Sequence, residues 1–79
     1  MTTLDTLNQS AAIAARDGVE RGIAVLEARL KVDIKLIHVD VQDYFRKQRT
    51  QDLAGLEQLK KLRGELNRRV FDAYKEENP

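Results

Sequence analysis

The chain has 79 residues, a formal net charge of +1 and no cysteine, so we expect one domain without disulfide bridges or thiolate metal sites. A single core of this size leaves a small margin of stability, and self-association is the expected additional support. No apolar run is long enough to cross a membrane, and the first residues lack a signal-peptide pattern, which predicts a soluble, cytoplasmic protein.

An alanine-rich segment opens the chain and predicts a first helix over residues 4–16, with Thr3 as its N-cap. Gly18 and Gly22 follow, and each glycine costs about 1 kcal/mol in the interior of a helix. Two glycines so close together favour a kink or a new helix start at this point. The alternative is a continuous helix in which small residues form a seam, namely Ala11, Ala15, Gly18 and Gly22.

A second helix is predicted over residues 18–46, because two apolar lines recur there at helical spacing. The first line consists of Val19, Ile23, Leu26, Leu30, Ile34, Ile37, Val41 and Tyr44. The second line lies roughly 130° away around the helix and consists of Val25, Val32, Leu36 and Val39. A helix with two apolar faces has to be covered from two sides, which predicts a position inside a bundle.

Residues 31–41 also allow a β-strand. Val and Ile are frequent in this segment, and Val32, Ile34 and Leu36 alternate with polar residues as in a half-buried strand. The alternation slips between Leu36 and Ile37, and no second strand is apparent, so a strand would have to pair across a dimer. The helix is the preferred prediction, and an α+β fold with this strand is the alternative.

The segment before the last helix contains no apolar side chain and predicts a connection over about residues 47–52. Thr50 or Asp52 would cap the last helix, which is predicted over residues 53–75. The single apolar line of that helix consists of Leu56, Leu59, Leu62, Leu66, Val70 and Ala73. The two long helices have comparable lengths and are expected to pack as an antiparallel hairpin.

These elements predict an all-α fold, in which a long antiparallel helical hairpin with a short N-terminal helix forms a dimeric helical bundle. The hairpin covers one apolar line of the central helix, and a second copy or another protein's amphipathic helix would cover the other. The predicted interface comprises Val25, Val32, Leu36 and Val39, flanked by the charged residues Arg29, Asp33 and Asp40, which would set its register. In outline this architecture resembles small bacterial or phage-borne regulators and secretion chaperones, without a family signature.

No motif indicates catalysis or a cofactor. His38 is the only histidine, and it lies on the polar side of the predicted helix without a second base or a nucleophile nearby. A metal site built from Asp33, Asp40 and Asp43 would need three carboxylates to converge, but the helical spacing separates Asp43 from Asp33. We therefore expect no catalytic residue, no cofactor and no metal.

The C-terminal half is basic, since residues 46–75 contain nine Lys and Arg against four Asp and Glu. This bias predicts, as the alternative function, a dimeric nucleic-acid-binding regulator. Its candidate contacts are Arg46, Lys47, Arg49, Lys60, Lys61, Arg63, Arg68 and Arg69. Those from Lys60 to Arg69 spread around the last predicted helix, whereas binding to phosphates requires one basic face.

The preferred prediction is a small, non-enzymatic protein-interaction module: a regulator, adaptor or chaperone-like protein. It would act through homo-oligomerisation, through capture of another protein on an exposed apolar helix face, or through both. The four aromatic residues, Tyr44, Phe45, Phe71 and Tyr74, are expected in the core, and an exposed anchor for a partner is the alternative.

Overall fold

The computed structural model describes residues 4–79, and these residues are all-helical, without a strand. In chain order the elements are the 3-10 turn η1 (Leu4–Thr6), the helix α1 (Gln9–Leu30), the 3-10 turn η2 (Ile34–Leu36) and the helix α2 (Val39–Glu77). The predicted all-α fold is confirmed, and the alternative strand over residues 31–41 is wrong. Thr3, the predicted N-cap, lies outside the described residues.

The first long helix is continuous where a kink was predicted. It begins after Asn8, whose Oδ1 accepts a hydrogen bond from the Ala11 N–H at 2.8 Å, and it passes through Gly18 and Gly22 without a break. The separate short N-terminal helix and the kink are therefore wrong. A Cβ added at Gly22 would lie 3.2 Å from Cδ1 of Leu59 on α2. The absence of that atom permits close packing, which offsets part of the intrinsic cost of glycine.

The second predicted helix is interrupted by a connection over residues 31–38. Two side chains cap its turns: Asp33 Oδ1 accepts the Lys35 N–H at 2.9 Å, and His38 Nδ1 accepts the Asp40 N–H at 3.3 Å. His38 is thereby the N-cap of α2, with Asp40 in the first turn, where a negative charge is favourable. The β-branched residues of this segment have weak helix propensity, so the local caps decide where α1 ends and α2 begins.

The helix α2 runs without interruption through residues 47–52, where the connection was predicted, so that prediction is wrong. Polar side chains of this segment contact α1 rather than forming a turn. Asp52 pairs with Arg29 at 3.1 Å, and Arg49 donates to the backbone carbonyls of Leu30, at the end of α1, and Val32, in the connection. Thr50 does not cap a helix either, because its hydroxyl donates to a carbonyl one turn earlier in α2.

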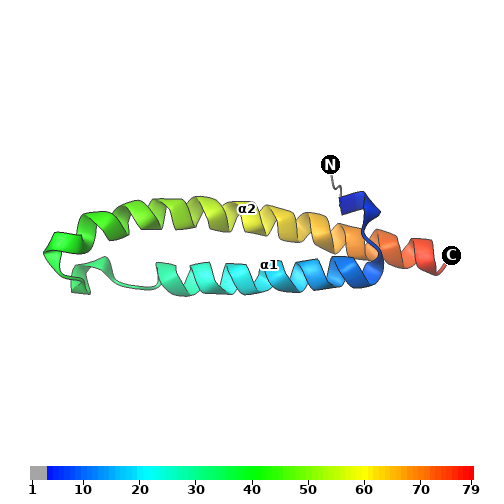
Figure 1. Cartoon of the computed structure of the whole chain (residues 1–79), viewed down its shortest axis with the longest axis horizontal. Helices are drawn as coiled ribbons and strands as arrows, with labels where there is room; N and C mark the ends of the chain where they lie inside the picture. Colours follow the sequence, from blue (N-terminus) through cyan, green and yellow to red (C-terminus); the bar gives the residue numbers. More distant parts are fainter. Residues whose placement is uncertain (1–3) are drawn as a thin grey trace.

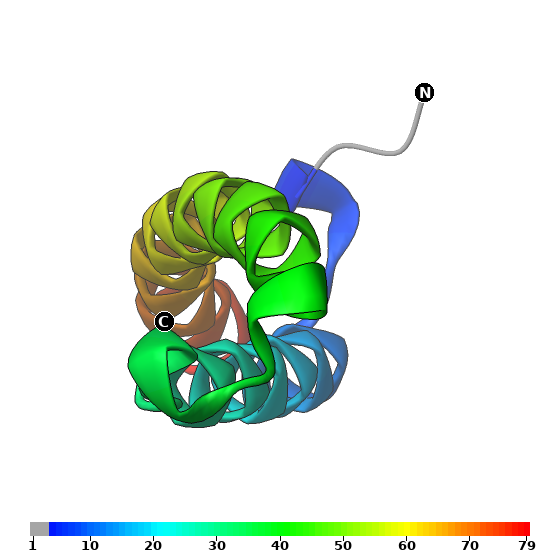
Figure 2. The same cartoon turned by 90° about the vertical axis from the view of Figure 1, so that its left-hand side faces the viewer.

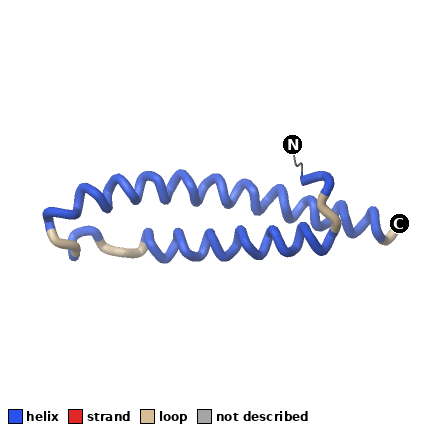
Figure 3. The backbone as a smooth tube through the Cα atoms, in the orientation of Figure 1, coloured by secondary structure: helices blue, strands red, loops and turns tan. Residues whose placement is uncertain are grey.

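The two long helices pack against each other as a hairpin that turns back at the connection (Figures 1, 2 and 3). Their contacts run in opposite order along the two helices: Glu20 pairs with Arg63 at 3.6 Å, and Arg29, further along α1, pairs with Asp52, earlier in α2. On α1, the predicted line of Val19, Ile23, Leu26 and Leu30 is buried or half-buried. These four residues repeat at three- and four-residue steps, the spacing of a coiled-coil seam.

The hairpin is long and thin, and its core is small. It measures 59 × 22 × 13 Å, and its radius of gyration is 17.1 Å, whereas a compact domain of this length would have about 12 Å. Among the described residues, the buried apolar side chains are Ala12, Ile23, Leu66 and Ala73, and Leu66 is the largest that is fully buried. Much of the apolar surface of the chain therefore remains exposed.

Candidate functional site

Exposed apolar side chains gather at the end of the hairpin where the connection lies. Ten large apolar residues are exposed in the described part of the chain, and six of them lie between residues 32 and 45. We call these six residues the apolar tip: Val32, Leu36, Val39, Val41, Tyr44 and Phe45. Single exposed apolar residues are normal on a protein surface, but their concentration in one short segment makes that segment a candidate interaction site.

The geometry of the short turn η2 determines which side chains of the connection are half-buried and which are exposed. A 3-10 helix has three residues per turn, so positions three apart share one side. Ile34 and Ile37 share such a side and are half-buried. Leu36 lies on the other side and is 86% exposed, the largest exposure of any apolar residue at the tip. The backbone of the connection therefore presents a leucine to solvent.

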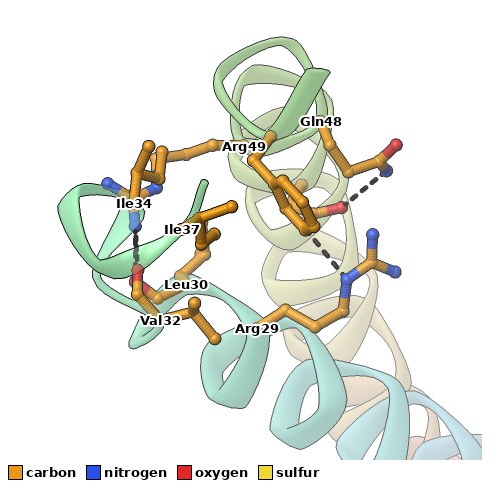
Figure 4. Close-up of a pocket in the computed structure, with 9 residues that line it drawn as sticks. Arg29, Leu30, Val32, Ile34, Ile37, Gln48 and Arg49 are labelled. Atoms are coloured by element: carbon orange, nitrogen blue, oxygen red, sulfur yellow. Dashed lines mark hydrogen bonds and ion pairs between the residues drawn. The ribbon is translucent and has the colours of Figure 1, made fainter. Parts of the chain in front are cut away.

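A cavity of about 100 Å³ lies between the connection, the end of α1 and the first turns of α2 (Figure 4). Its apolar lining consists of Leu30, Val32, Ile34, Ile37 and Phe45. Phe45 also packs edge to face against Tyr44, with ring centroids 5.5 Å apart. The tip therefore carries both a projecting apolar side chain and an apolar hollow.

Polar groups hold the opposite wall of this cavity in place (Figure 4). Arg49 Nη2 donates to the Leu30 carbonyl at 3.3 Å, at the end of α1, and to the Val32 carbonyl at 2.6 Å, in the connection. Asp52, which is 7% exposed, pairs with Arg29 at 3.1 Å and accepts from Gln48 at 3.3 Å. The cavity is thereby built on a cross-linked junction of the two long helices.

The predicted interface residues lie partly at this tip. Val32, Leu36 and Val39 are all exposed there, while Val25 is exposed on α1, five residues before its end. The charged residues do not form one strip, because each has its own local contact. Arg29 pairs with Asp52, Asp33 caps η2 and Asp40 lies beside His38.

The tip also contains residues that the sequence reasoning placed elsewhere. Val41 and Tyr44 were assigned to the covered line of the second predicted helix, and Phe45 was expected in the core, but all three are exposed. Phe71 and Tyr74, also expected in the core, are exposed near the end of α2. The signal that was missed is the pair of capping residues Asp33 and His38, which places the start of α2 next to these side chains.

Half of the candidate nucleic-acid contacts already have protein partners. Arg46 binds Asp43 and Gln42, Arg49 binds backbone carbonyls, Arg63 pairs with Glu20, and Arg69 pairs with Glu76. In the described part of the chain, Lys47, Lys60, Lys61 and Arg68 have no ion pair or side-chain hydrogen bond. The basic residues of α2 are therefore divided between structural contacts and open surface.

Arg69 ties the N-terminal segment to α2. Its Nε donates to the Leu7 carbonyl at 2.8 Å, and its two terminal nitrogens donate to the carboxylate of Glu76 at 3.2 and 2.8 Å. These hydrogen bonds lower the pKa of Glu76, and the same contact raises the pKa of Arg69. Both residues are thus charged at neutral pH and hold the segment that begins with η1 against the helix (Figure 1).

No constellation for metal binding was found in residues 4–79, since no three His, Cys, Asp or Glu side chains converge there. His38 is used as a helix cap. Within the same residues, no helical stretch combines the length and the apolar character that a membrane span requires.

No protein-family model matches the chain, and neither a curated protein nor a solved structure matches it. The surface chemistry of the molecule is therefore the basis for assigning a function, and the apolar tip is its most distinctive part.

Proposed function

We propose that the protein is a small, non-enzymatic interaction module, a regulator, adaptor or chaperone-like protein, that self-associates through its apolar tip. The observation that carries this proposal is the gathering of six exposed large apolar side chains around one connection. Burial of apolar surface contributes about 25 cal/mol per Å², so a contact that covers these side chains removes the largest uncompensated exposure in the described molecule.

The size of the tip supports a contact with a second copy. With roughly 150–200 Å² of surface for each large side chain, the exposed fractions correspond to about 600 Å² per copy. A stable interface buries about 800 Å² per partner, so the apolar side chains of the tip would supply part of that area and the polar residues around them the rest. The small core of the hairpin supports the same conclusion, because a domain of this size commonly gains its remaining stability from oligomerisation.

Self-association is tested by light scattering and sedimentation over a wide range of protein concentration. We expect a dimer that dissociates on dilution. The double variant Leu36→Asp/Val39→Asp places two carboxylates in the tip and should shift the protein to monomer with unchanged helical circular dichroism, because these side chains are 86% and 70% exposed. The matched control Gln51→Asp/Gln58→Asp adds the same charge at exposed positions further along α2 and should leave the dimer intact.

Two outcomes would contradict the proposal: a parent protein that stays monomeric at the highest concentration reached, or a dimer that the tip variant leaves unchanged. The alternative of nucleic-acid binding has less support, because four of its eight candidate residues are engaged within the protein. It predicts retention on DNA or RNA that falls steeply with salt. Substitution of Lys60 and Lys61 by Gln would abolish such retention if it occurred.

A further inference from the structure

The apolar tip carries a projecting side chain, Leu36, and an apolar-walled cavity that Leu36 of the same chain does not fill. Leu36 projects outward from η2, whereas Ile34 and Ile37, a third of a turn away around the same 3-10 turn, line the cavity. Because Leu36 is not among the residues that line the cavity, and the 3-10 geometry points it away, it does not fill the cavity of its own chain. Both features lie at the same end of the hairpin.

The volume of the cavity indicates which kind of side chain it can hold, and a branched aliphatic side chain fits best. Apolar cavities of ~150 Å³ are large enough to hold benzene, and this cavity has about 100 Å³. A leucine side chain suits that volume better than an aromatic ring does. Leu30, Ile34, Ile37 and Phe45 offer it apolar contacts on one wall, and the opposite wall is formed by Arg29, Gln48, Arg49 and Asp52, whose polar groups are paired with one another or with backbone carbonyls.

The charges around the tip are compatible with a contact between identical surfaces. Over residues 31–46, Lys31, Lys35 and Arg46 balance Asp33, Asp40 and Asp43. The two signs of charge are partly separated. The connection carries two lysines and one aspartate, a net charge of +1, and the following turns of α2 carry two aspartates and one arginine, a net charge of −1. Two copies related by a two-fold axis can place the connection of one against the start of α2 of the other, which brings opposite charges together.

We infer that two copies associate tip to tip, and that Leu36 of each copy inserts into the cavity beside Phe45 of the other. The contact is reciprocal, since a two-fold axis makes each copy both donor and acceptor of the leucine. It buries the most exposed apolar residue of each copy in the cavity of about 100 Å³ on the other. This inference rests on the self-association proposed above and specifies where and how it occurs.

The first test measures the shape of the dimer. Because each hairpin is 59 Å long and 22 Å wide, a tip-to-tip dimer has a longest dimension well beyond 59 Å, approaching twice that value. A dimer formed along the sides of the helices stays close to 59 Å. Small-angle X-ray scattering separates the two arrangements. A compact dimer would overturn the inference while leaving self-association intact, whereas a monomeric parent would overturn both.

The second test measures the contribution of the leucine. We expect Leu36→Ala to weaken the dimer by about tenfold to a hundredfold, because each dimer loses two central apolar contacts. The matched control is Leu53→Ala, which removes the same atoms from a side chain that is 53% exposed on α2 outside the tip. That control should leave the dissociation constant within about threefold of the parent. Equal effects of the two substitutions would contradict the inference.

The third test establishes that the leucine and the cavity meet each other. Val32→Phe fills the cavity from its edge and should weaken the dimer by blocking the incoming leucine. Mixing the Val32→Phe chain with the Leu36→Ala chain restores one complete contact, since the first supplies a leucine and the second an open cavity. We expect the mixture to form a heterodimer tighter than either homodimer. A mixture no tighter than the tighter of the two homodimers would show that the two features do not contact each other.

Discussion

The shaft of the hairpin and its apolar tip differ in how completely their side chains are paired or covered by other parts of the chain. Along the shaft, which we define as α1 together with residues 48–77 of α2, polar groups that approach the seam have partners: Arg16 donates to Asn67 at 3.2 Å, and Glu20 pairs with Arg63. At the apolar tip the backbone is capped, but six large apolar side chains remain 39–86% exposed. Two helices can pair each other's polar groups along one seam. Each helix covers only one face of the other, so apolar residues on other faces stay exposed.

The largest effect on the shaft is expected from Leu66→Ala. Leu66 is 1% exposed and is the largest fully buried side chain. Its truncation should cost about 2–5 kcal/mol through lost burial and the cavity left behind, which is comparable to the total stability of so small a core. Urea denaturation followed by circular dichroism measures the loss. The half-exposed Leu53 provides the comparison, and a Leu66→Ala loss no larger than that of Leu53→Ala would contradict the assigned core.

A smaller loss is expected where a polar group closes the shaft next to the tip. Asp52→Ala leaves Arg29 and Gln48 without their shared carboxylate, and it should cost about 1–3 kcal/mol. Asp52→Asn retains the shape and part of the hydrogen bonding, so its loss should be intermediate. If both variants matched the parent in urea denaturation, the ion pair would not contribute to the junction. Because the cavity is built on this junction, Asp52→Ala should also weaken self-association.

The two glycines of α1 distinguish its inner and outer surfaces. A Cβ at Gly18 meets nothing within 4 Å, whereas one at Gly22 meets Leu59 at 3.2 Å. Gly18→Ala should therefore stabilise the hairpin by about 0.5–1 kcal/mol through lower backbone entropy in the unfolded chain. Gly22→Ala should be less stable than Gly18→Ala by about 1 kcal/mol, because Leu59 has to move. Thermal unfolding compares them, and the reverse order would contradict the packing.

Gly18→Ala also tests the location of the interface. The tip-to-tip arrangement leaves the outer surface of α1 uncovered, so an added methyl group there should not change the dissociation constant of the dimer. A strongly weakened dimer would instead place the outer surface of α1 in the contact.

The smallest effect is expected at the far end of the shaft, where Arg69 holds Glu76. The hydrogen bonds from Arg69 lower the pKa of Glu76, so the folded state binds this proton less readily than the unfolded state. The resulting stabilisation is complete above the unfolded pKa of about 4.3 and is lost as the pH falls through the lower folded value. Glu76→Gln should flatten this part of the acid limb in pH-dependent unfolding. The neighbouring substitution Glu77→Gln is the control, and equal curves for the two would contradict the contact.

The amino-acid sequence by itself determined the all-helical class and much of the helix seam. Val19, Ile23, Leu26 and Leu30 recur at helical spacing and are covered by α2, and Leu66 and Ala73 of the last predicted apolar line are buried. These assignments succeeded because the periodicity of apolar residues reports directly on which side of a helix is covered. Val25, Val32, Leu36 and Val39 are exposed, but the break between the helices distributes them over α1, the connection and the start of α2 instead of one helix face.

The position of the turn was decided by the tertiary structure. Residues 47–52 have no apolar side chain, which favours a loop when only neighbours in sequence are considered, but Arg49 and Asp52 find partners at the end of α1 and keep the segment helical. The segment between the two long helices is apolar enough to suggest a helix or a strand, yet Asp33 and His38 cap short turns there. Contacts with residues far apart in sequence supply hydrogen-bond and ion-pair partners for the polar segment and keep it helical. Local capping of the backbone interrupts the helix in the apolar segment. The turn therefore lies where these partners and caps place it, and the polarity of the sequence alone does not locate it.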